Sequence, residues 1–238
     1  MKVLLIGKTE VDLFPPQGNS RHVMPGKADS SEFQRRVSED HDYCTEGGQE
    51  LIEFAGRLCY ESFDLPNEKT KTNSAYIKNI VAQGHESVLE HVSVTFYVEG
   101  VSRNLSHELI RHRHLSFSEL SQRFVNMEKA NVVIPPAYGG GLEPLSQRHA
   151  ELYALEVDEL QAGTKTRKQA REAARYGLPS GIETKLVVSG NLRAWRDVLK
   201  KRLSVHADAE IREFAQEVLH TLTVEYPDVF ADINYEES

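Results

Sequence analysis

Hydrophobic and polar side chains alternate most clearly over residues 92–98, where valine or phenylalanine occupies every second position. A period of two is typical of a strand with one buried face. Residues 183–188 predict a second strand, and the apolar run over residues 2–7 predicts a third, which we expect to be short and buried.

Apolar residues at helical spacing predict the other elements. Leu51, Ala55 and Leu58 indicate a helix that begins near residue 49, and a second helix extends from about residue 73 to Gly84. A third begins near Ser102 and leads into a basic segment. Further helices are expected over residues 144–163, 165–176 and 191 to about 224, the last of them capped by Asn191.

The remaining segments predict loops. Residues 15–48 are polar, with Gly, Pro and Ser throughout, and predict a long loop or insertion to which we assign no function. The glycines at 139–141 are interpreted as a connector, because the Lys-Ser/Thr of a phosphate-binding loop does not follow them. No repeat or linker divides the sequence. We therefore expect a single α+β domain over residues 1–238, built as an antiparallel sheet with several long helices.

Composition and charge exclude several classes of protein. The 238 residues are 39% hydrophobic and 27% charged, as in soluble globular proteins, and the net charge of −8 argues against general nucleic-acid binding. The apolar N-terminal run is too short for a signal peptide, and no stretch is long enough to span a membrane. With two cysteines and no CxxC motif, we expect a cytoplasmic protein.

Residues 111–123 carry far more positive charge than the rest of the chain. They contain three arginines, two histidines and three serines with a single carboxylate, Glu119. Because fixed guanidinium charges repel one another, a bound anion such as phosphate would stabilise this segment. The alternative is a basic helix face in contact with solvent.

Two further cationic pairs have helical spacing. Arg171 and Arg175 share a helix face, and we expect Arg202 and His206 to share a face of the last helix. Leucine and valine neighbours surround Arg202, so we expect it to be partly buried beside an anionic or carbonyl partner. Lys201 is interpreted as part of the solvated side of that helix.

Two other kinds of site have weaker support. Histidines 85, 91, 107, 112 and 114 with Glu90 are numerous enough for a metal site, but nearby arginines would repel a dication. Cys59 lies in an apolar helix, where cysteine is usually an inert core residue, and Ser121 lacks the partners of a catalytic triad. Without a thiolate, metal or triad, we expect a cofactor to supply the difficult chemistry.

The segments together resemble the flavin-dependent thymidylate synthases. Arg111-His112-Arg113, seven further residues and Ser121 match the RHRX7S signature of that family. The resemblance extends over about residues 50–232, and its other blocks are residues 84–91, 107–110, 174–175, 191–193, Arg202 and 206–208. It implies an α+β homotetramer whose active sites are shared between chains.

The resemblance also implies a reaction, the reductive methylation of dUMP to dTMP. Methylenetetrahydrofolate would donate the carbon, and FAD reduced by NADPH would supply the hydride, with no enzyme nucleophile and no metal. The implied partners are dUMP, folate and NADPH, without nucleic acid or membrane. The alternative is a non-catalytic nucleotide-binding module with the same arginine pocket.

Residue roles are implied at positions that match the family. Arg202 is expected to be catalytic, because a fixed cation against the pyrimidine would stabilise the negative charge that develops when hydride adds to uracil. The residues expected to bind the flavin are Ser87, Arg111, His112, Arg113, Glu119, Asn191, Arg193, Asp197, Arg202 and His206. Those expected to bind the nucleotide are Glu108, Leu109, Ile110, Arg111, Glu119, Leu120, Ser121, Gln122, Arg123, Arg175 and Arg202.

Overall fold

A four-stranded antiparallel sheet forms the centre of the molecule. The computed structural model describes residues 1–11, 47–62, 67, 69–135 and 143–235. The strands lie in the order β1 (Lys2–Lys8), β2 (Ser93–Ser102), β4 (Glu183–Asn191) and β3 (Ser116–Glu119). This sheet and the surrounding helices confirm the predicted α+β class.

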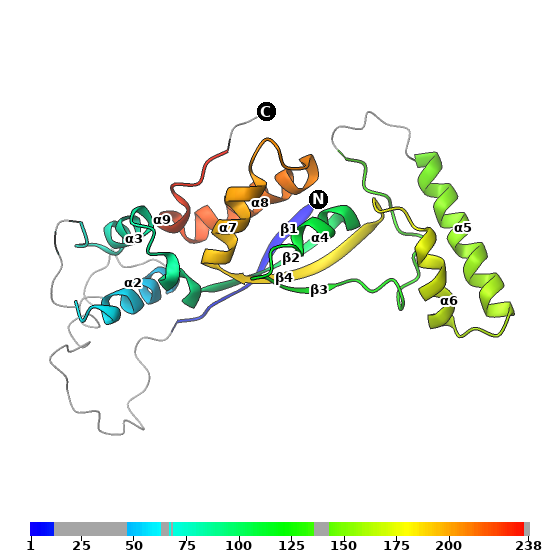
Figure 1. Ribbon diagram of the computed structural model, residues 1–238, viewed down its shortest axis with the longest axis horizontal. Helices are drawn as coiled ribbons and strands as arrows, with labels where there is room; N and C mark the ends of the chain where they lie inside the picture. Colours follow the sequence, from blue (N-terminus) through cyan, green and yellow to red (C-terminus); the bar gives the residue numbers. More distant parts are fainter. Residues whose placement is uncertain (12–46, 63–66, 68, 136–142, 236–238) are drawn as a thin grey trace, which may run out of the picture.

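Alternation along β2 places one face of the sheet in the core. Val94, Phe96 and Val98 are buried, and β4 follows the same pattern in register with β2. Helices α4 (Arg103–Leu109), α7 (Leu192–Arg202) and α8 (Ala209–Glu225) lie on the same side of the sheet in Figure 1. Trp195 of α7 packs edge-on against Phe96, with 5.1 Å between ring centroids.

β1 is an edge strand, paired only with β2. Its formation was predicted, but the prediction that it is buried was wrong for this chain, since Leu4 is 41% and Ile6 55% exposed. Leu4 lies on the face of the sheet opposite the core, in register with Tyr97 and Val187, whereas Ile6 lies at an irregularity in the pairing of β1 with β2. In Figure 1 the helices α4, α7 and α8 all lie on the other side of the sheet.

The single helix predicted over residues 191–224 is interrupted. α7 ends at Arg202, and α8 begins after Asp208, whose side chain accepts a hydrogen bond from the backbone N–H of Glu210. Ser204 binds the backbone N–H of His206 in the same turn. Short polar side chains compete with helical hydrogen bonds in this way, so they end one helix and start the next. Arg202 and His206 therefore do not share a helix face.

The buried face of α2 (Gly48–Cys59) is largely polar, which the apolar spacing did not predict. Glu53 and Arg57 are completely enclosed, whereas Leu58 is 56% exposed. Cys59 is also exposed, so its interpretation as a core cysteine was wrong. Helices α3 (Asn73–Ala82), η2 (Glu86–His91) and α9 (Pro227–Phe230) pack close by.

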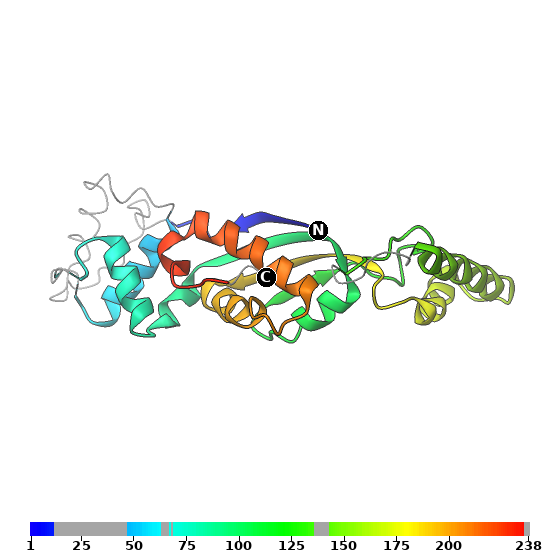
Figure 2. The same cartoon turned by 90° about the horizontal axis from the view of Figure 1, so that it is seen from above.

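Helices α5 (Glu143–Ala162) and α6 (Arg167–Ala174), followed by the turn η3 (Arg175–Gly177), form an arm that projects from the sheet (Figures 1 and 2). Thr166 caps α6 through a reciprocal capping box with Gln169. The arm has its own hydrophobic cluster, made of Met127, Tyr153, Val157, Ala170, Ala174 and Ile182.

Two sequence predictions fall outside the described residues, namely most of the polar insertion (residues 15–46) and the glycines at 139–141. Residue 48, the predicted end of the insertion, is the first residue of α2. The single-domain organisation stays a prediction. Among the described helices, none combines the length and hydropathy needed to cross a bilayer.

Candidate active site

The sheet brings the C-terminal ends of α4 and α7 together. Ser102 caps α4 at the end of β2, and Asn191 caps α7 at the end of β4, through bonds of 3.1 and 2.8 Å to backbone N–H groups. Because β2 and β4 are antiparallel, the two helices start from opposite ends of the strand pair. They extend towards each other, and their last turns meet at Glu108 and Arg202.

Two adjoining cavities lie along α7, beside Arg111-His112-Arg113, which we call the RHR motif. They measure about 340 and 450 Å³ and share His114, Ala194 and Asp197 in their walls. Their remaining lining residues are mostly cationic or polar: Glu90, Arg111, His112, Arg113, Leu115, Asn191, Arg193, Lys201 and Arg202. The region can therefore accept an extended anionic ligand.

Arg202 is held by three hydrogen bonds within its own chain. Its Nη1 donates to the Glu108 carboxylate at 2.7 Å, its Nη2 to the Glu108 carbonyl at 3.1 Å, and its Nε to His112 Nε2 at 3.0 Å. Its side chain is 20% exposed. The expected partly buried arginine with anionic and carbonyl partners is therefore confirmed.

His112 lies under the cavity and is 9% exposed. Burial lowers the pKa of this imidazole, and the Arg202 guanidinium lowers the pKa further. The Asp197 carboxylate lies 3.5 Å from its Nδ1. Partial burial acts to raise the pKa of Asp197, but the ammonium of Lys201, 2.7 Å away, keeps it below its usual value.

Leu115 anchors the motif to the sheet. Its backbone N–H donates to the His112 carbonyl at 3.2 Å, which closes a tight turn. Its side chain packs on Gly190 of β4, where an added Cβ would lie only 2.3 Å from Leu115 Cδ2. Gly190 therefore sets the depth at which the RHR turn rests on the sheet.

Three ionisable residues in the cavity walls, Glu90, His114 and Lys201, were not predicted to bind the flavin or the nucleotide. Glu90 forms an ion pair with Arg193, and His114 lines both cavities. Lys201, predicted to be only a solvated residue, also lines the wall and remains 62% exposed. Its spacing of four from Asp197 is the sequence signal that could have identified it.

A second group of predicted site residues lies towards the arm. The Ser121 carbonyl accepts from the N–H groups of Phe124 and Val125 in a tight turn, and Arg171 of α6 donates to the Phe124 carbonyl. The described cavities beside α7 include none of this group, which comprises Leu120, Ser121, Gln122, Arg123 and Arg175. In one chain the predicted nucleotide-binding residues therefore form two separate clusters.

The other predicted residues have different surroundings. Glu119 on β3 binds Arg103 and Thr184, each at 3.0 Å. Leu109 is fully buried in the core, so only its backbone could contact a ligand, whereas Ile110 is 45% exposed. Ser87 lies on η2 and His206 in the turn after α7, and neither lines the cavities beside the RHR motif.

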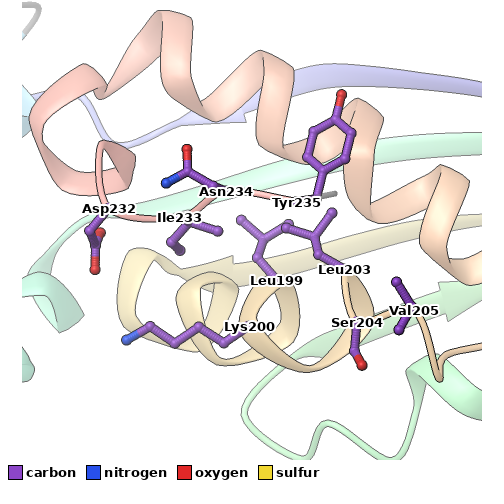
Figure 3. A pocket seen from close by; sticks show the side chains of 9 residues that line it. All are labelled: Leu199, Lys200, Leu203, Ser204, Val205, Asp232, Ile233, Asn234 and Tyr235. Carbon is purple, nitrogen blue, oxygen red and sulfur yellow. The ribbon is translucent and has the colours of Figure 1, made fainter. Parts of the chain in front are cut away.

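The second side of α7 borders a different cavity of about 350 Å³ (Figure 3). Leucines and valine from α7 and its following turn form one wall, and residues 232–235 form the other. Its charged residues already have partners, since Lys200 binds Glu86 and Asp232 binds Arg196. In the described ranges, no three potential metal-ligating side chains group together. The cavity beside the RHR motif is thus the better anion site.

Comparison with known proteins agrees with this geometry. The family model described as thymidylate synthase complementing protein matches residues 42–228. Proteins named flavin-dependent thymidylate synthase are 48% identical over 204 residues in Mycobacterium sp. (strain JLS) and 48% over 201 residues in Mycobacterium tuberculosis (strain ATCC 25177 / H37Ra). Each alignment covers 79% of this chain and 80% of the relative.

A solved structure supports the fold independently. The crystal structure of thymidylate synthase X from Helicobacter pylori, with FAD and dUMP, superimposes with a TM-score of 0.57 at 24% identity. The match covers 78% of this chain and 93% of that one. Together with the family model and the identity to the mycobacterial proteins, this result shows that the chain belongs to the flavin-dependent thymidylate synthase family.

Proposed function

We propose that the protein converts dUMP to dTMP, with methylenetetrahydrofolate as carbon donor and NADPH as reductant. The observation that carries this proposal is the cationic cavity between the RHR motif and α7, with Arg202 fixed in its wall. We also propose that the enzyme acts in the cytoplasm, as expected for nucleotide synthesis.

The residues of the two adjoining cavities fit FAD. Arg111, Arg113 and Arg193 supply guanidinium donors for a pyrophosphate, and Asn191 and His114 add further polar groups along the same wall. Bound FAD, reduced by NADPH, would supply the hydride for the new methyl group.

Arg202 acts on the pyrimidine in this proposal. Its guanidinium has five N–H bonds, and the three bonds to Glu108 and His112 leave one N–H on each terminal nitrogen. Those two N–H bonds can donate to a uracil carbonyl on which negative charge develops. Because Glu108 and His112 fix the fork in advance, little reorganisation is needed during reaction.

Arg123, Ser121 and Arg175 would bind the nucleotide phosphate from the arm side. Since they are separate from Arg202 in one chain, we infer that a complete site combines α7 of one subunit with the arm of another. The exposed side chains of Leu4 and Ile6 on the edge strand β1 support an oligomer, because exposed apolar side chains favour association. By resemblance the assembly is a homotetramer with small-molecule substrates.

The test is direct. Purified protein should bind FAD and show flavin absorption in the visible range, and it should form dTMP from dUMP, methylenetetrahydrofolate and NADPH. Omission of any one of the three substrates should stop dTMP formation. Protein that binds dUMP and FAD but never forms dTMP would instead be the non-catalytic nucleotide-binding module.

A further inference from the structure

Two contacts of the His112 ring determine where its proton lies. An arginine Nε–H only donates, so the His112 Nε2 that faces it at 3.0 Å must offer a lone pair. The ring is then neutral and carries its hydrogen on Nδ1. That nitrogen faces Asp197 Oδ2 at 3.5 Å, somewhat longer than the usual N–H···O hydrogen bond of about 2.7 to 3.2 Å, and the Asp197 carboxylate is the nearest acceptor among its described contacts.

We propose that Asp197 is a positioning residue: by accepting Nδ1–H of His112, it selects the tautomer whose Nε2 orients the Arg202 guanidinium. This inference rests on the proposed function, because the orientation matters only when Arg202 acts on the pyrimidine. It gives Asp197 a role through His112, in place of the direct flavin contact implied by resemblance.

The charges around His112 favour this arrangement. Four charged groups lie around the His112 ring in alternating sign: Lys201 beside Asp197 on its Nδ1 side, and Arg202 beside Glu108 on its Nε2 side. A protonated His112 would add a cation next to Arg202 and lose the acceptor for its Nε–H. Burial and Arg202 both lower the pKa of the imidazole, which agrees with a neutral ring.

The geometry also explains why a tautomer could matter. The two terminal nitrogens of Arg202 both donate to Glu108, and the Nε of Arg202 donates the third bond to His112. With hydrogen on Nε2 instead, two N–H bonds would point at each other and the fork would rotate. A displacement of about 1 Å at such a group reduces turnover by about 100-fold.

The experiment compares Asp197→Ala and Asp197→Asn with the wild-type holoenzyme. We expect Asp197→Ala to reduce kcat by about 10- to 100-fold, with the KM for dUMP and the FAD content changed by less than about twofold. Asp197→Asn keeps a carbonyl acceptor and should recover much of the lost kcat. Glu213→Ala, which removes an exposed carboxylate on α8, is the control and should leave kcat unchanged.

Histidine-selective ¹³C NMR measures the tautomer directly, with the His112 signal assigned by its loss in His112→Gln. The wild type should show Nδ1–H, and Asp197→Ala should show a substantial fraction of Nε2–H. If Asp197→Ala keeps the wild-type tautomer and a near wild-type kcat, the proposal is overturned. It is also overturned if Asp197→Ala binds less FAD but turns over normally per bound FAD, because Asp197 would then act on flavin binding. The NMR measurement needs no turnover, so it remains decisive even where wild-type protein forms no dTMP. If Asp197→Ala does not fold, Asp197→Leu, which also removes the acceptor but keeps a similar side-chain volume, gives the same comparison.

Discussion

Arg196 of α7 forms a two-point ion pair with Asp232, through Nη1 and Nη2 at 2.7 and 2.8 Å, and this pair fastens the C-terminal segment to α7. Arg196 also donates to Glu86 at 3.0 Å and to the Val229 carbonyl. Its side chain is only 1% exposed, whereas that of Asp232 is 47% exposed. The arginine therefore depends on these partners for the stability of a buried charge.

We expect Arg196→Ala to lower the free energy of unfolding by about 2 to 4 kcal/mol, because it removes buried packing and leaves its carboxylate partners without a cation. Asp232→Asn should cost less, about 1 kcal/mol, since solvent already screens this carboxylate. Urea unfolding at one fixed protein concentration measures both values. Lys2→Ala, which removes an exposed ion pair with Glu99, is the control and should change stability little.

The same contacts predict how stability depends on pH. Hydrogen bonds from Arg196 lower the pKa of Asp232, and Lys200 with Arg196 lowers the pKa of Glu86 although burial opposes the shift. Carboxyls with a lowered folded pKa stabilise the protein above their unfolded pKa, and this contribution disappears as the pH falls towards the folded pKa. The urea concentration at the midpoint of unfolding should therefore decrease as the pH is lowered below about 4. In Asp232→Asn this decrease should be less steep. An identical pH profile in the two proteins would contradict this assignment.

A second buried charge supports the segment after α2. Arg57 Nε binds Glu53 at 2.6 Å, and its terminal nitrogens donate to the carbonyls of Ser62 and Thr70 at 3.1 and 2.7 Å. Arg57→Met should destabilise the protein by about 3 to 5 kcal/mol, because Glu53 keeps a buried charge without its cation. Arg57→Met combined with Glu53→Gln should recover part of that loss. A single variant as stable as wild type would show that Arg57 is dispensable.

Arg202→Ala tests the proposed catalytic arginine. It should reduce dTMP formation by about 1000-fold while the protein still folds and binds FAD. Arg202→Lys should also fail, because an ammonium cannot bind Glu108 and His112 with a planar fork. Lys200→Ala is the control, since this neighbour faces the other side of α7, and it should retain turnover. Near wild-type turnover in Arg202→Ala would remove Arg202 from the mechanism.

Mixed oligomers test whether a site is shared between chains. Arg175→Ala should mainly raise the dissociation constant for dUMP, so at low dUMP it and Arg202→Ala should each be inactive. When the two variants are produced together, some sites combine an intact α7 with an intact arm from another chain, and dTMP formation should return. Mixtures no more active than the separate variants would indicate that each chain forms its own site.

Sequence patterns predicted the strands and helices whose apolar periodicity is strong. They did not predict β3, because Ser116–Glu119 is short and has one apolar residue, and it becomes a strand only by pairing with β4. The break between α7 and α8 was missed because Asp208 and Ser204 act through local hydrogen bonds that do not alter the hydrophobic pattern.

The site was predictable to a similar extent. The partly buried Arg202 followed from its apolar neighbours, but its partners came from distant parts of the chain, and no spacing links Asp197 to His112. The division of the nucleotide-binding residues into two clusters likewise depends on how far the arm lies from α7, which the sequence spacing does not encode (Figure 1).

The arm has its own small core, apart from the main one over the sheet. A segment stabilised by a separate cluster can open as one cooperative unit while the rest of the molecule stays folded. The amides of α5 and α6 should therefore exchange with solvent deuterium together and faster than those of α7 and α8. A ligand that bridges the arm and α7 would slow that exchange, so the arm would report on site assembly without any measurement of turnover.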